Sequence, residues 1–282
     1  MNLVSGKNNL DKIIISYSIV LYRTDKILLK KTIDSFKRCN LNIQLYLIDN
    51  SPTNVLESLV MSSHMQYLHN PSNPGFGAAH NIAIQKAIAA GSNYHFIVNP
   101  DIFFNEDVIA PMIEYMINNN DVGMMMPQIL NLDGTVQNLP KLIPSPFSIL
   151  LRKIKKPRAY YKKFIEMYEL RNVPKQQIYN APILSGCFTL LNLKAIEEIG
   201  MYDDNYFMYF EDWDLSRRMH QKYKTIYYPL VSVYHGYHSG ANKSFKLFKI
   251  FIHSAFTYFN KWGWFFDNDR KQINKKALSQ FE

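Results

Sequence analysis

Three carboxylates lie within four positions of one another in an aromatic stretch, FMYFEDWDLSRR. Because neighbouring carboxylates repel one another in apolar surroundings, such groups need a proton, a cation or a catalytic task. An acidic first helical turn, followed by Arg217 and Arg218 on the next turn, would account for Asp214. It would not account for Glu211 and Asp212 together, so these two residues are candidates for acid–base chemistry.

Another carboxylate, Asp101, follows Asn99 at the end of the apolar stretch FIVNPD. Tyr22, Asp49 and His235 also stand where strand-like residues end. Because open α/β sheets bind ligands at the carboxyl ends of their strands, these residues form a candidate ligand-binding set. For Asp49 a helix-capping role is an equal alternative.

The elements that must position these residues follow an α/β pattern. A β-branched strand at 13–22, a helix at 26–39 and a strand at 41–49 predict a βαβ unit with a parallel sheet. Further helices are expected at 55–61, 77–90, 107–120, 193–199 and from about 245, and further strands at 65–70, 93–101, 122–130, 183–192 and 225–235. Prolines interrupt the basic segment 140–182, which we interpret as an excursion over the surface.

Composition and charge limit the class of protein. The chain has 282 residues, 47% of them hydrophobic, which suffices for one sizeable folded domain. Its net charge of +9 favours anionic partners such as nucleotide phosphates, nucleic acid or acidic lipid. Cys39 and Cys187 show no disulfide or metal-binding spacing, which favours the cytoplasm. No secretory signal and no membrane-spanning segment are expected.

The segment NPSNPGFGAAHNIAIQ resembles a dinucleotide-binding loop only in part. It has the form G-x-G-x-x-H from Gly75 to His80, and no acidic residue follows at the required distance. An NAD site is therefore disfavoured. Gly75 and Gly77 would instead let the backbone approach a ligand, or they form an ordinary turn before a helix.

The order of seven motifs resembles the bacterial family 2 glycosyltransferases, in particular their rhamnosyltransferase-like branch. The motifs are IVLYRTD, LYLIDNSP, NPSNPGFGAAHNIAI, FIVNPDI, SGCFTLLN, FMYFEDWDL and VYHGYHSG, and the resemblance covers about residues 13–260. It implies a GT-A fold, a Rossmann-like and mostly parallel sheet flanked by helices. The implied domains are a catalytic domain at 1–240, with a nucleotide-binding half at 13–100 and an acceptor half at 101–240, and a C-terminal amphipathic helical extension at 241–282.

The resemblance also implies how a nucleotide-sugar donor is bound. Tyr22, Asp49 and Gly75 would line the nucleotide pocket, and Asn99 would help to hold the ribose or the diphosphate. Asp101 would bind a divalent cation, Mg²⁺ or Mn²⁺, which prefers oxygen ligands and shares its coordination with phosphates and water. His235 would be a further metal ligand, with His238 as the neighbouring alternative.

The same resemblance implies an inverting glycosyl transfer. Asp212 would be the catalytic base and Glu211 would orient it, since inversion needs one carboxylate to deprotonate the acceptor hydroxyl. Gly186 would let the acceptor approach, and Trp213 would stack on a sugar ring or pack in the core. The donor would be dTDP-rhamnose or a UDP-sugar. The acceptor would be a glycan or a polyprenyl-diphosphate-linked sugar in cell-surface polysaccharide synthesis, such as O-antigen or capsule.

The predicted C-terminal helix is amphipathic and basic. Its apolar residues are Phe245, Phe248, Phe251, Ile252, Ala255, Phe256, Phe259 and Trp262, and the polar side carries Lys243, Lys246, Lys249, His253 and Asn260. This pattern suits peripheral contact with the inner face of the cell membrane. It equally suits packing on the catalytic domain or on a second subunit of a homodimer.

Two other function classes are weighed against this one. The segment RKIKKPRAYYKK, residues 152–163, interleaves basic residues with tyrosines, as some single-strand nucleic-acid binders do. Carboxylates at the strand ends would repel a phosphate backbone, so no nucleic-acid partner is expected. A non-catalytic nucleotide-sugar or glycan-binding protein is the other alternative, and the presence of Asp101, Asp212 and His235 together argues against it.

Overall fold

The computed structural model describes residues 12–39, 41–60, 62–236 and 244–282. The strands are β1 (Ile15–Leu21), β2 (Ile43–Asp49), β3 (Met65–His69), β4 (Tyr94–Val98), β5 (Ile102–Phe103), β6 (Val122–Leu130), β7 (Tyr179–Asn180), β8 (Phe188–Asn192) and β9 (Lys224–His235). The helices are α2 (Lys26–Lys37), α3 (Phe76–Ala89), α4 (Ile109–Asn118), α5 (Pro146–Ile154), α6 (Arg158–Tyr168), α7 (Leu193–Ile199), α8 (Glu211–Lys222), α9 (Phe245–Trp262) and α10 (Asn268–Leu278), with short 3₁₀ turns at Glu57–Leu59 and Ser279–Phe281.

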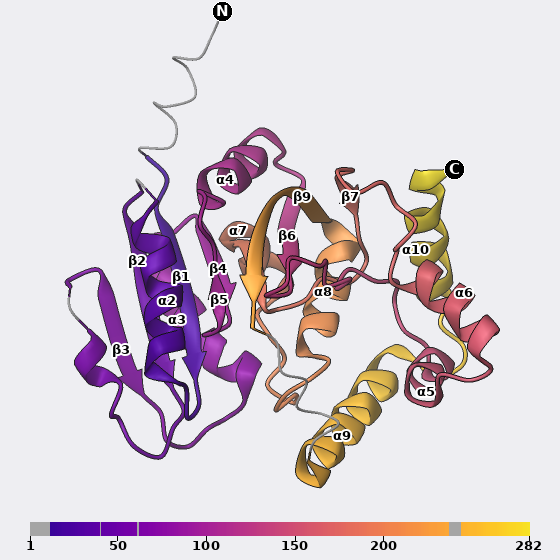
Figure 1. Ribbon diagram of the computed structural model, residues 1–282, viewed down its shortest axis with the longest axis horizontal. Helices are drawn as coiled ribbons and strands as arrows, with labels where there is room; N and C mark the ends of the chain where they lie inside the picture. Colours follow the sequence, from indigo (N-terminus) through magenta and orange to yellow (C-terminus); the bar gives the residue numbers. More distant parts are fainter. Residues whose placement is uncertain (1–11, 40, 61, 237–243) are drawn as a thin grey trace, which may run out of the picture.

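One mixed sheet organises the described part of the chain (Figure 1). Its strand order is β3-β2-β1-β4-β8-β6-β9-β5, and β7 pairs with β9. Strands β1 to β4 are parallel, and β6 is parallel to β9. Strand β8 lies antiparallel between β4 and β6, so these two strands run in the same direction. The prediction of a mostly parallel sheet flanked by helices is confirmed.

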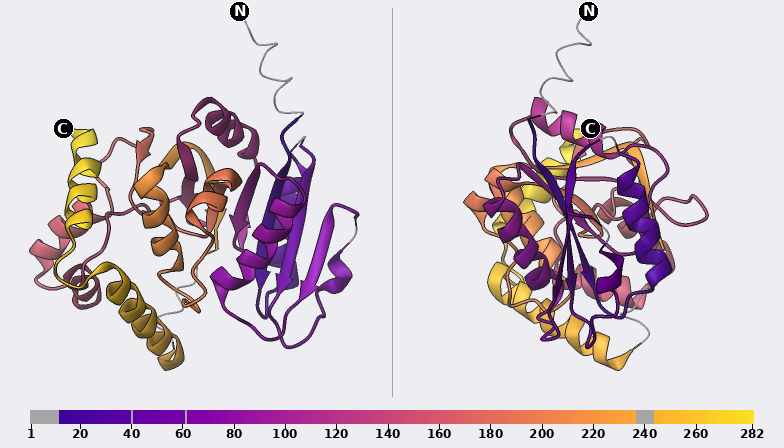
Figure 2. Two further views of the ribbon diagram at one scale, coloured as in Figure 1. Left: turned by 180° about the vertical axis from the view of Figure 1, so that it is seen from behind. Right: turned by 90° about the vertical axis from the view of Figure 1, so that its left-hand side faces the viewer.

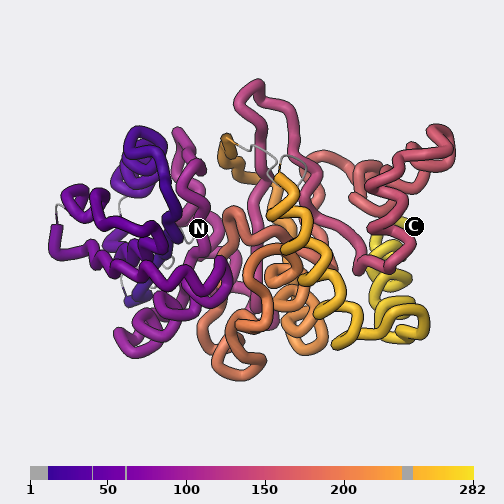
Figure 3. The backbone as a smooth tube through the Cα atoms, turned by 90° about the horizontal axis from the view of Figure 1, so that it is seen from below, coloured from indigo at the N-terminus to yellow at the C-terminus, as the bar shows by residue number. Residues whose placement is uncertain are grey.

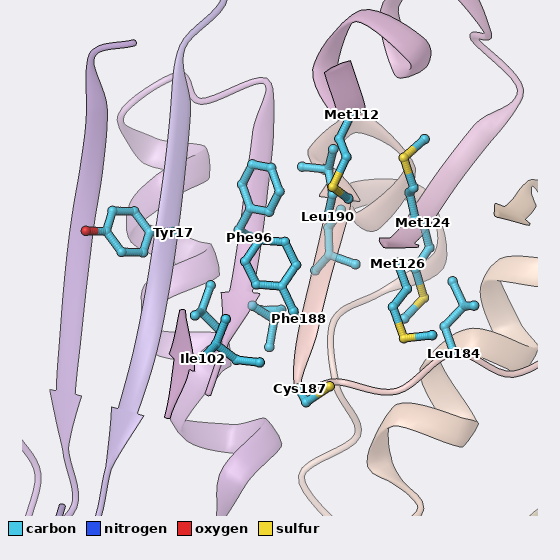
Figure 4. Packing of buried hydrophobic residues seen from close by; sticks show 14 of the residues in the cluster. Tyr17, Phe96, Ile102, Met112, Met124, Met126, Leu184, Cys187, Phe188 and Leu190 are labelled. Atoms are coloured by element: carbon cyan, nitrogen blue, oxygen red, sulfur yellow. The ribbon is translucent and has the colours of Figure 1, made fainter. Parts of the chain in front are cut away.

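Continuous apolar strands explain why both faces of the sheet are covered. Strand β1, ISYSIVL, is buried along almost its whole length, as expected for a parallel strand between two helical layers. Helices α2 and α3 lie on opposite faces of this sheet (Figure 2). Aromatic rings of Phe96 and Phe188, with centroids 5.5 Å apart, join β4 to β8 in the core shown in Figure 4.

A buried polar network fixes α3, the helix between β3 and β4, against the sheet. The Ser18 hydroxyl on β1 lies 2.7 Å from Nδ1 of His80 and 2.7 Å from Nε2 of His95. Burial lowers the pKa of both imidazoles, that of His95 to about 3, so both rings are neutral at physiological pH. The histidine of the glycine-rich segment therefore serves packing between α3, β1 and β4.

The basic segment 140–182 is more ordered than the surface excursion that we expected. It contains α5 and α6, and Leu151, Ile165 and Tyr168 from these helices are buried. A capping box in which Ser145 and Ser148 bond each other's backbone begins α5. Two of the prolines that suggested an irregular segment, Pro146 and Pro157, stand at helix starts, where proline is tolerated.

The C-terminal helices are attached to α8 by buried ion pairs. Asp214 accepts hydrogen bonds from Arg218 and from the Trp262 indole, at 2.8 Å each. Arg217 donates two hydrogen bonds, at 2.8 and 2.7 Å, to Asp267, which also caps the start of α10. Asp214 is thus explained by structure, as the sequence indicated. None of the helices in the described ranges is long and apolar enough to cross a bilayer.

We expect Asp267→Asn to lower the free energy of unfolding by about 3–5 kcal/mol, because it leaves the buried Arg217 guanidinium without a counter-charge. Asn can still cap α10, so the loss reports the charge and not the cap. The matched control is Asp34→Asn, which breaks an exposed pair with Lys37 and should cost at most about 1 kcal/mol. Urea denaturation measures both. Equal losses in the two variants would contradict the structural role of the buried pair.

Candidate functional site

The candidate catalytic carboxylates begin helix α8. Tyr209 and Phe210, directly before it, have φ values of 71° and 67°. This left-handed conformation costs about 1–3 kcal/mol per non-glycine residue. Packing of the buried Phe210 ring holds it in place, because its centroid lies 4.5 Å from that of Trp213 and 5.5 Å from that of Tyr258. The sharp turn places Glu211 and Asp212 in the first turn of α8, where the helix dipole favours negative charge.

The loop before β8 brings this helix to the end of β4. The backbone N–H of Gly186 donates to Oδ2 of Asp212 at 3.2 Å. One residue later, the Cys187 carbonyl accepts a hydrogen bond from the Asn99 N–H at 2.8 Å. Two residue sets from distant parts of the chain therefore meet at one loop. The sequence predicted Asn99 at a strand end and Asp212 near a helix start, but it gave no distance between them.

The pairing of β5 with β9 brings Asp101 beside His235. Ile102 is opposite His235 in the register, and Oδ1 of Asp101 lies 3.4 Å from Nε2 of His235. Nδ1 of His235 lies 3.1 Å from Oε1 of Gln137, an acceptor, which favours the tautomer with the proton on Nδ1 and the lone pair of Nε2 toward the Asn99 amide. Gln137, which the sequence analysis missed, thus selects the tautomer suited to metal binding.

One cavity of about 620 Å³ connects these groups. From the predicted site it is lined by Asn99, Asp101, Gly186, Glu211, Asp212, Trp213 and His235, and it is also lined by Lys141, Arg152, Lys153 and Lys155. Arg152, Lys153 and Lys155 belong to the basic cluster 152–163, which from the sequence would add charge to a membrane-facing surface or hold the diphosphate of an acceptor. No pattern in the sequence marked Lys141. A carboxylate pair, an Asp–His pair and a cationic wall therefore face the same space.

Electrostatics distinguishes the two carboxylates at the start of α8. Burial, and then the charge of Asp212, raises the pKa of Glu211 well above its usual value, and Oε2 of Glu211 has no partner in the described part of the chain. Burial also raises the pKa of Asp212, but the Gly186 N–H and the Lys141 ammonium oppose this shift. Asp212 is half-buried and lines the cavity. Of the two, Asp212 is therefore the carboxylate suited to accept a proton from a ligand.

Asp101 and His235 are suited to be two of the ligands of one divalent cation. A carboxylate oxygen and an imidazole nitrogen are both ligands for Mn²⁺, and 3.4 Å is short enough for them to share one ion. Within the described ranges no group of three His, Cys, Asp or Glu residues could hold a metal. Further ligands would have to come from a bound phosphate and water. His238, the alternative ligand, lies outside the described residues.

The residues expected at the nucleotide lie apart from this cavity's lining. Asp49 is fully buried, and its oxygens accept from the Ser51 N–H at 2.9 Å and from the Tyr67 hydroxyl at 2.6 Å. Tyr22 is 50% exposed. Gly75, at φ 109°, begins α3, and a Cβ there would overlap the carbonyl oxygen of Phe207. This close approach is thus to the protein backbone, and the nucleotide-binding roles of the three residues stay predictions.

The fold has known counterparts among solved structures. The structure of GalNAc-T7 with UDP, GalNAc and Mn²⁺ matches 89% of this chain and 50% of its own, with a TM-score of 0.62 at 15% identity. The structure of S. aureus TarS 1-349 matches 94% of this chain and 71% of its own, with a TM-score of 0.58 at 10% identity. At such identities the likeness concerns the fold, and it confirms the predicted GT-A fold.

Sequence relatives share most of the chain. Rhamnosyltransferase WbbL of Escherichia coli (strain K12) is 24% identical over 86% of this chain and 91% of its own length. N-acetylglucosaminyl-diphospho-decaprenol L-rhamnosyltransferase of Mycobacterium tuberculosis (strain ATCC 25618 / H37Rv) is 24% identical over 68% of this chain and 66% of its own. The profile of one family, Glycosyl transferase family 2, matches residues 19–200. The chain therefore belongs to glycosyl transferase family 2, and it is a glycosyltransferase.

Proposed function

We propose that this chain transfers L-rhamnose, or a related hexose, from a nucleoside-diphosphate donor to an acceptor hydroxyl with inversion at the anomeric carbon. The observation that carries the proposal is the single cavity that holds both Asp212 and the Asp101–His235 pair. An inverting transfer needs one base and one group of positive charge at the leaving diphosphate. A protein that only bound the sugar nucleotide would have no use for the base.

Asp212 is the base of the proposed reaction. One oxygen is held by the Gly186 N–H at 3.2 Å, which leaves the other for the acceptor hydroxyl. As the acceptor oxygen bonds to the anomeric carbon, its proton passes to Asp212. The bond from that carbon to the diphosphate breaks, and the diphosphate leaves with the electron pair. Glu211, whose pKa burial and the charge of Asp212 raise well above its usual value, favours its neutral form and so limits the negative charge beside the base.

Asp101 and His235 would hold the divalent cation, Mg²⁺ or Mn²⁺. When bound there, such an ion supplies positive charge that stabilises the departing diphosphate. The amide of Asn99 lies 3.3 Å from Nε2 of His235, and a cation bound to Nε2 would replace this contact. Tyr22, Asp49, Gly75 and Asn99 remain our proposals for the donor side, and Gly186 and Trp213 for the acceptor side.

The donor sugar and the pathway are proposed from the relatives. Two of them are named as rhamnosyltransferases, and one name specifies a diphospho-decaprenol acceptor. We therefore favour dTDP-rhamnose over a UDP-sugar as donor. A lipid-linked or glycan acceptor of a cell-surface polysaccharide pathway, such as O-antigen or capsule synthesis, completes the proposed reaction in the cytoplasm.

The exposed face of α9 fits the inner face of a membrane. Ala255, Tyr258 and Phe259 on one side of α9 are buried in a cluster with Phe210, so part of the predicted apolar stripe packs on the catalytic domain. Four apolar side chains on its other side remain exposed, with exposed fractions of 73% for Phe245, 41% for Phe248, 38% for Ile252 and 53% for Phe256. In Figure 1, β1, β2 and β9 point toward the edge of the molecule at which α9 lies, and Figure 3 shows α9 from that side.

Charge complementarity selects an anionic bilayer as the occupant of this face. Lys246 and Lys249 lie on α9 between the exposed rings, and the Lys249 ammonium is 4.7 Å from the centre of the Phe245 ring. A basic and aromatic helix of this kind binds the headgroup layer, and each lysine near an anionic surface contributes about 1 kcal/mol. The other lysine predicted for this face, Lys243, lies outside the described residues.

Asp212→Asn should lower kcat about 100-fold or more, because Asn keeps the side-chain size and cannot take the proton. Donor binding should persist, and Glu211→Gln should cost less. In the wild type, the raised pKa of Asp212 moves the acid limb of the kcat/KM profile above the usual carboxyl range. Activity is present above that pKa and is lost as the pH falls through it. A larger loss from Glu211→Gln than from Asp212→Asn would reverse the two roles.

Removal of the metal should abolish turnover. We expect excess EDTA to stop release of the nucleoside diphosphate, Mn²⁺ to restore it, and Asp101→Asn to raise the Mn²⁺ concentration needed for half-maximal rate. The matched control, Asp121→Asn, changes a carboxylate that is 57% exposed and should behave as the wild type. Undiminished rates in both EDTA and Asp101→Asn would remove the metal from the proposal.

Co-sedimentation with vesicles tests the membrane face. The wild type should pellet with vesicles that contain anionic phospholipid, less so at high salt, and the double variant Lys246→Glu, Lys249→Glu should remain in the supernatant. A control with the same change in net charge, Lys175→Glu with Lys194→Glu, alters exposed lysines outside α9 and should still pellet. Equal recovery of wild type and α9 variant with anionic vesicles would leave this face without its proposed occupant.

A further inference from the structure

A buried lysine without a counter-ion faces the catalytic cavity. Lys141 is 7% exposed and lines the same cavity as Asp212. Its backbone is fixed by a bridge to Ile183. Across the described ranges its ammonium has neither a hydrogen bond nor an ion pair, and the aromatic ring that it faces, that of Trp213, has its centre 5.4 Å away. The pKa of Lys141 falls to about 8, first through burial and then through the charge of Arg152.

A buried charge of this kind is costly unless an anion compensates it. The acidic side chains near Lys141 do not fill that role. Glu169 is already shared by two cations, Arg152 at 3.4 Å and Arg171. Asp212 attracts Lys141 but does not lie within ion-pair distance of it. The wall formed by Lys141 and Arg152 therefore carries an excess of positive charge toward the cavity.

The position of Lys141 indicates which phosphate it would meet. The charges of Glu169 and Asp212 act on it, and Asp212 is the proposed base, against which the acceptor lies. From Arg152 the cationic wall continues along α5 to Lys153, whose ammonium lies 4.9 Å from the ring centre of Phe251 on α9. The wall thus runs from the base toward the helix whose outer face is apolar.

We propose that Lys141, with Arg152 beside it, binds a phosphate of the acceptor, so that the preferred acceptor is a sugar joined to a lipid through a diphosphate. The assignment rests on the proposed glycosyl transfer. The acceptor sugar lies against Asp212 with its reacting hydroxyl, and the diphosphate on the same sugar lies against Lys141. The lipid continues past Lys153 toward the exposed face of α9.

The kinetic test compares two acceptors with one sugar. The probes are N-acetylglucosamine on a diphospho-farnesyl chain and octyl N-acetylglucosaminide, which has no phosphate. The wild type should prefer the diphosphate acceptor, and Lys141→Met should reduce the ratio of the two kcat/KM values about tenfold to hundredfold, the range for loss of a charged hydrogen bond. Lys194→Met, which removes an exposed lysine from α7, should keep the wild-type ratio.

A binding test needs no turnover. In EDTA, where a metal-dependent donor site is disabled, inorganic diphosphate should raise the Tm of the wild type and of Lys194→Met but not that of Lys141→Met. Lys141→Met removes a buried charge and keeps an unbranched side chain of nearly the same length, so the variant should remain folded. Its Tm without diphosphate checks that it does.

Each outcome has a distinct meaning. A wild type that uses both acceptors equally well, or a Lys141→Met variant that loses both to the same extent, would overturn the acceptor assignment. So would a variant whose main defect is a raised KM for the donor, since Lys141 would then serve the donor diphosphate. If the wild type neither transfers sugar nor releases nucleoside diphosphate, the proposed function fails, and the shift in Tm by diphosphate still decides whether Lys141 binds a phosphate.

Discussion

The short loop at Gly186 and Cys187 is the constraint on which the site depends. It accepts a hydrogen bond from Asn99 at the end of β4 and donates one to Asp212 at the start of α8. A side chain at residue 186 would come within 3.3 Å of the Phe76 ring and 3.5 Å of the Asp212 Cβ. Because β8 follows directly and lies between β4 and β6, the position of this loop is set by the centre of the sheet. Asn99, at the end of β4, and Asp212, the proposed base, are therefore held in one rigid frame.

Helix α8 connects the candidate catalytic carboxylates to helices α9 and α10. Its first turn carries Glu211 and Asp212, and its later turns carry Asp214 and the buried Arg217. These later residues bind Trp262 and Asp267, which fixes the C-terminal end of α9 and the start of α10 against α8. The result is a helix that is half core and half exposed. In our account the same arrangement lets the exposed half meet the lipid of an acceptor whose sugar lies at Asp212.

Local patterns in the sequence predicted most elements, because apolar strands and capped helices are determined by nearby residues. The start of α9 at Phe245 and the whole of α7 and β6 are examples. The prediction that Asp101 and His235 act at one metal site came from a family resemblance and not from periodicity. Lys141 and Gln137 could not be found in this way. Their roles arise from contacts with residues far away along the chain, and neither lies in a motif.

Long-range packing also changed the meaning of residues that the sequence did single out. The absent side chain of Gly75 accommodates the backbone at Phe207, and the Phe76 N–H donates to that carbonyl at 2.9 Å, so this glycine also has a structural role. His80 completes a buried network with Ser18. A glycine or a histidine in such a motif can either pack within the protein or bind a ligand. The residue type does not tell these roles apart, and only the fold does.

The stereochemistry of the product tests the central claim most directly. If Asp212 removes the proton while the acceptor attacks opposite the diphosphate, a single displacement inverts the anomeric carbon. The measurement is the anomeric configuration of the glycoside, determined by NMR on product made from a donor of known configuration. The account predicts the configuration opposite to that of the donor. A product that retains the donor's configuration would contradict it, because retention would require a second nucleophile or a front-face path that this arrangement does not include.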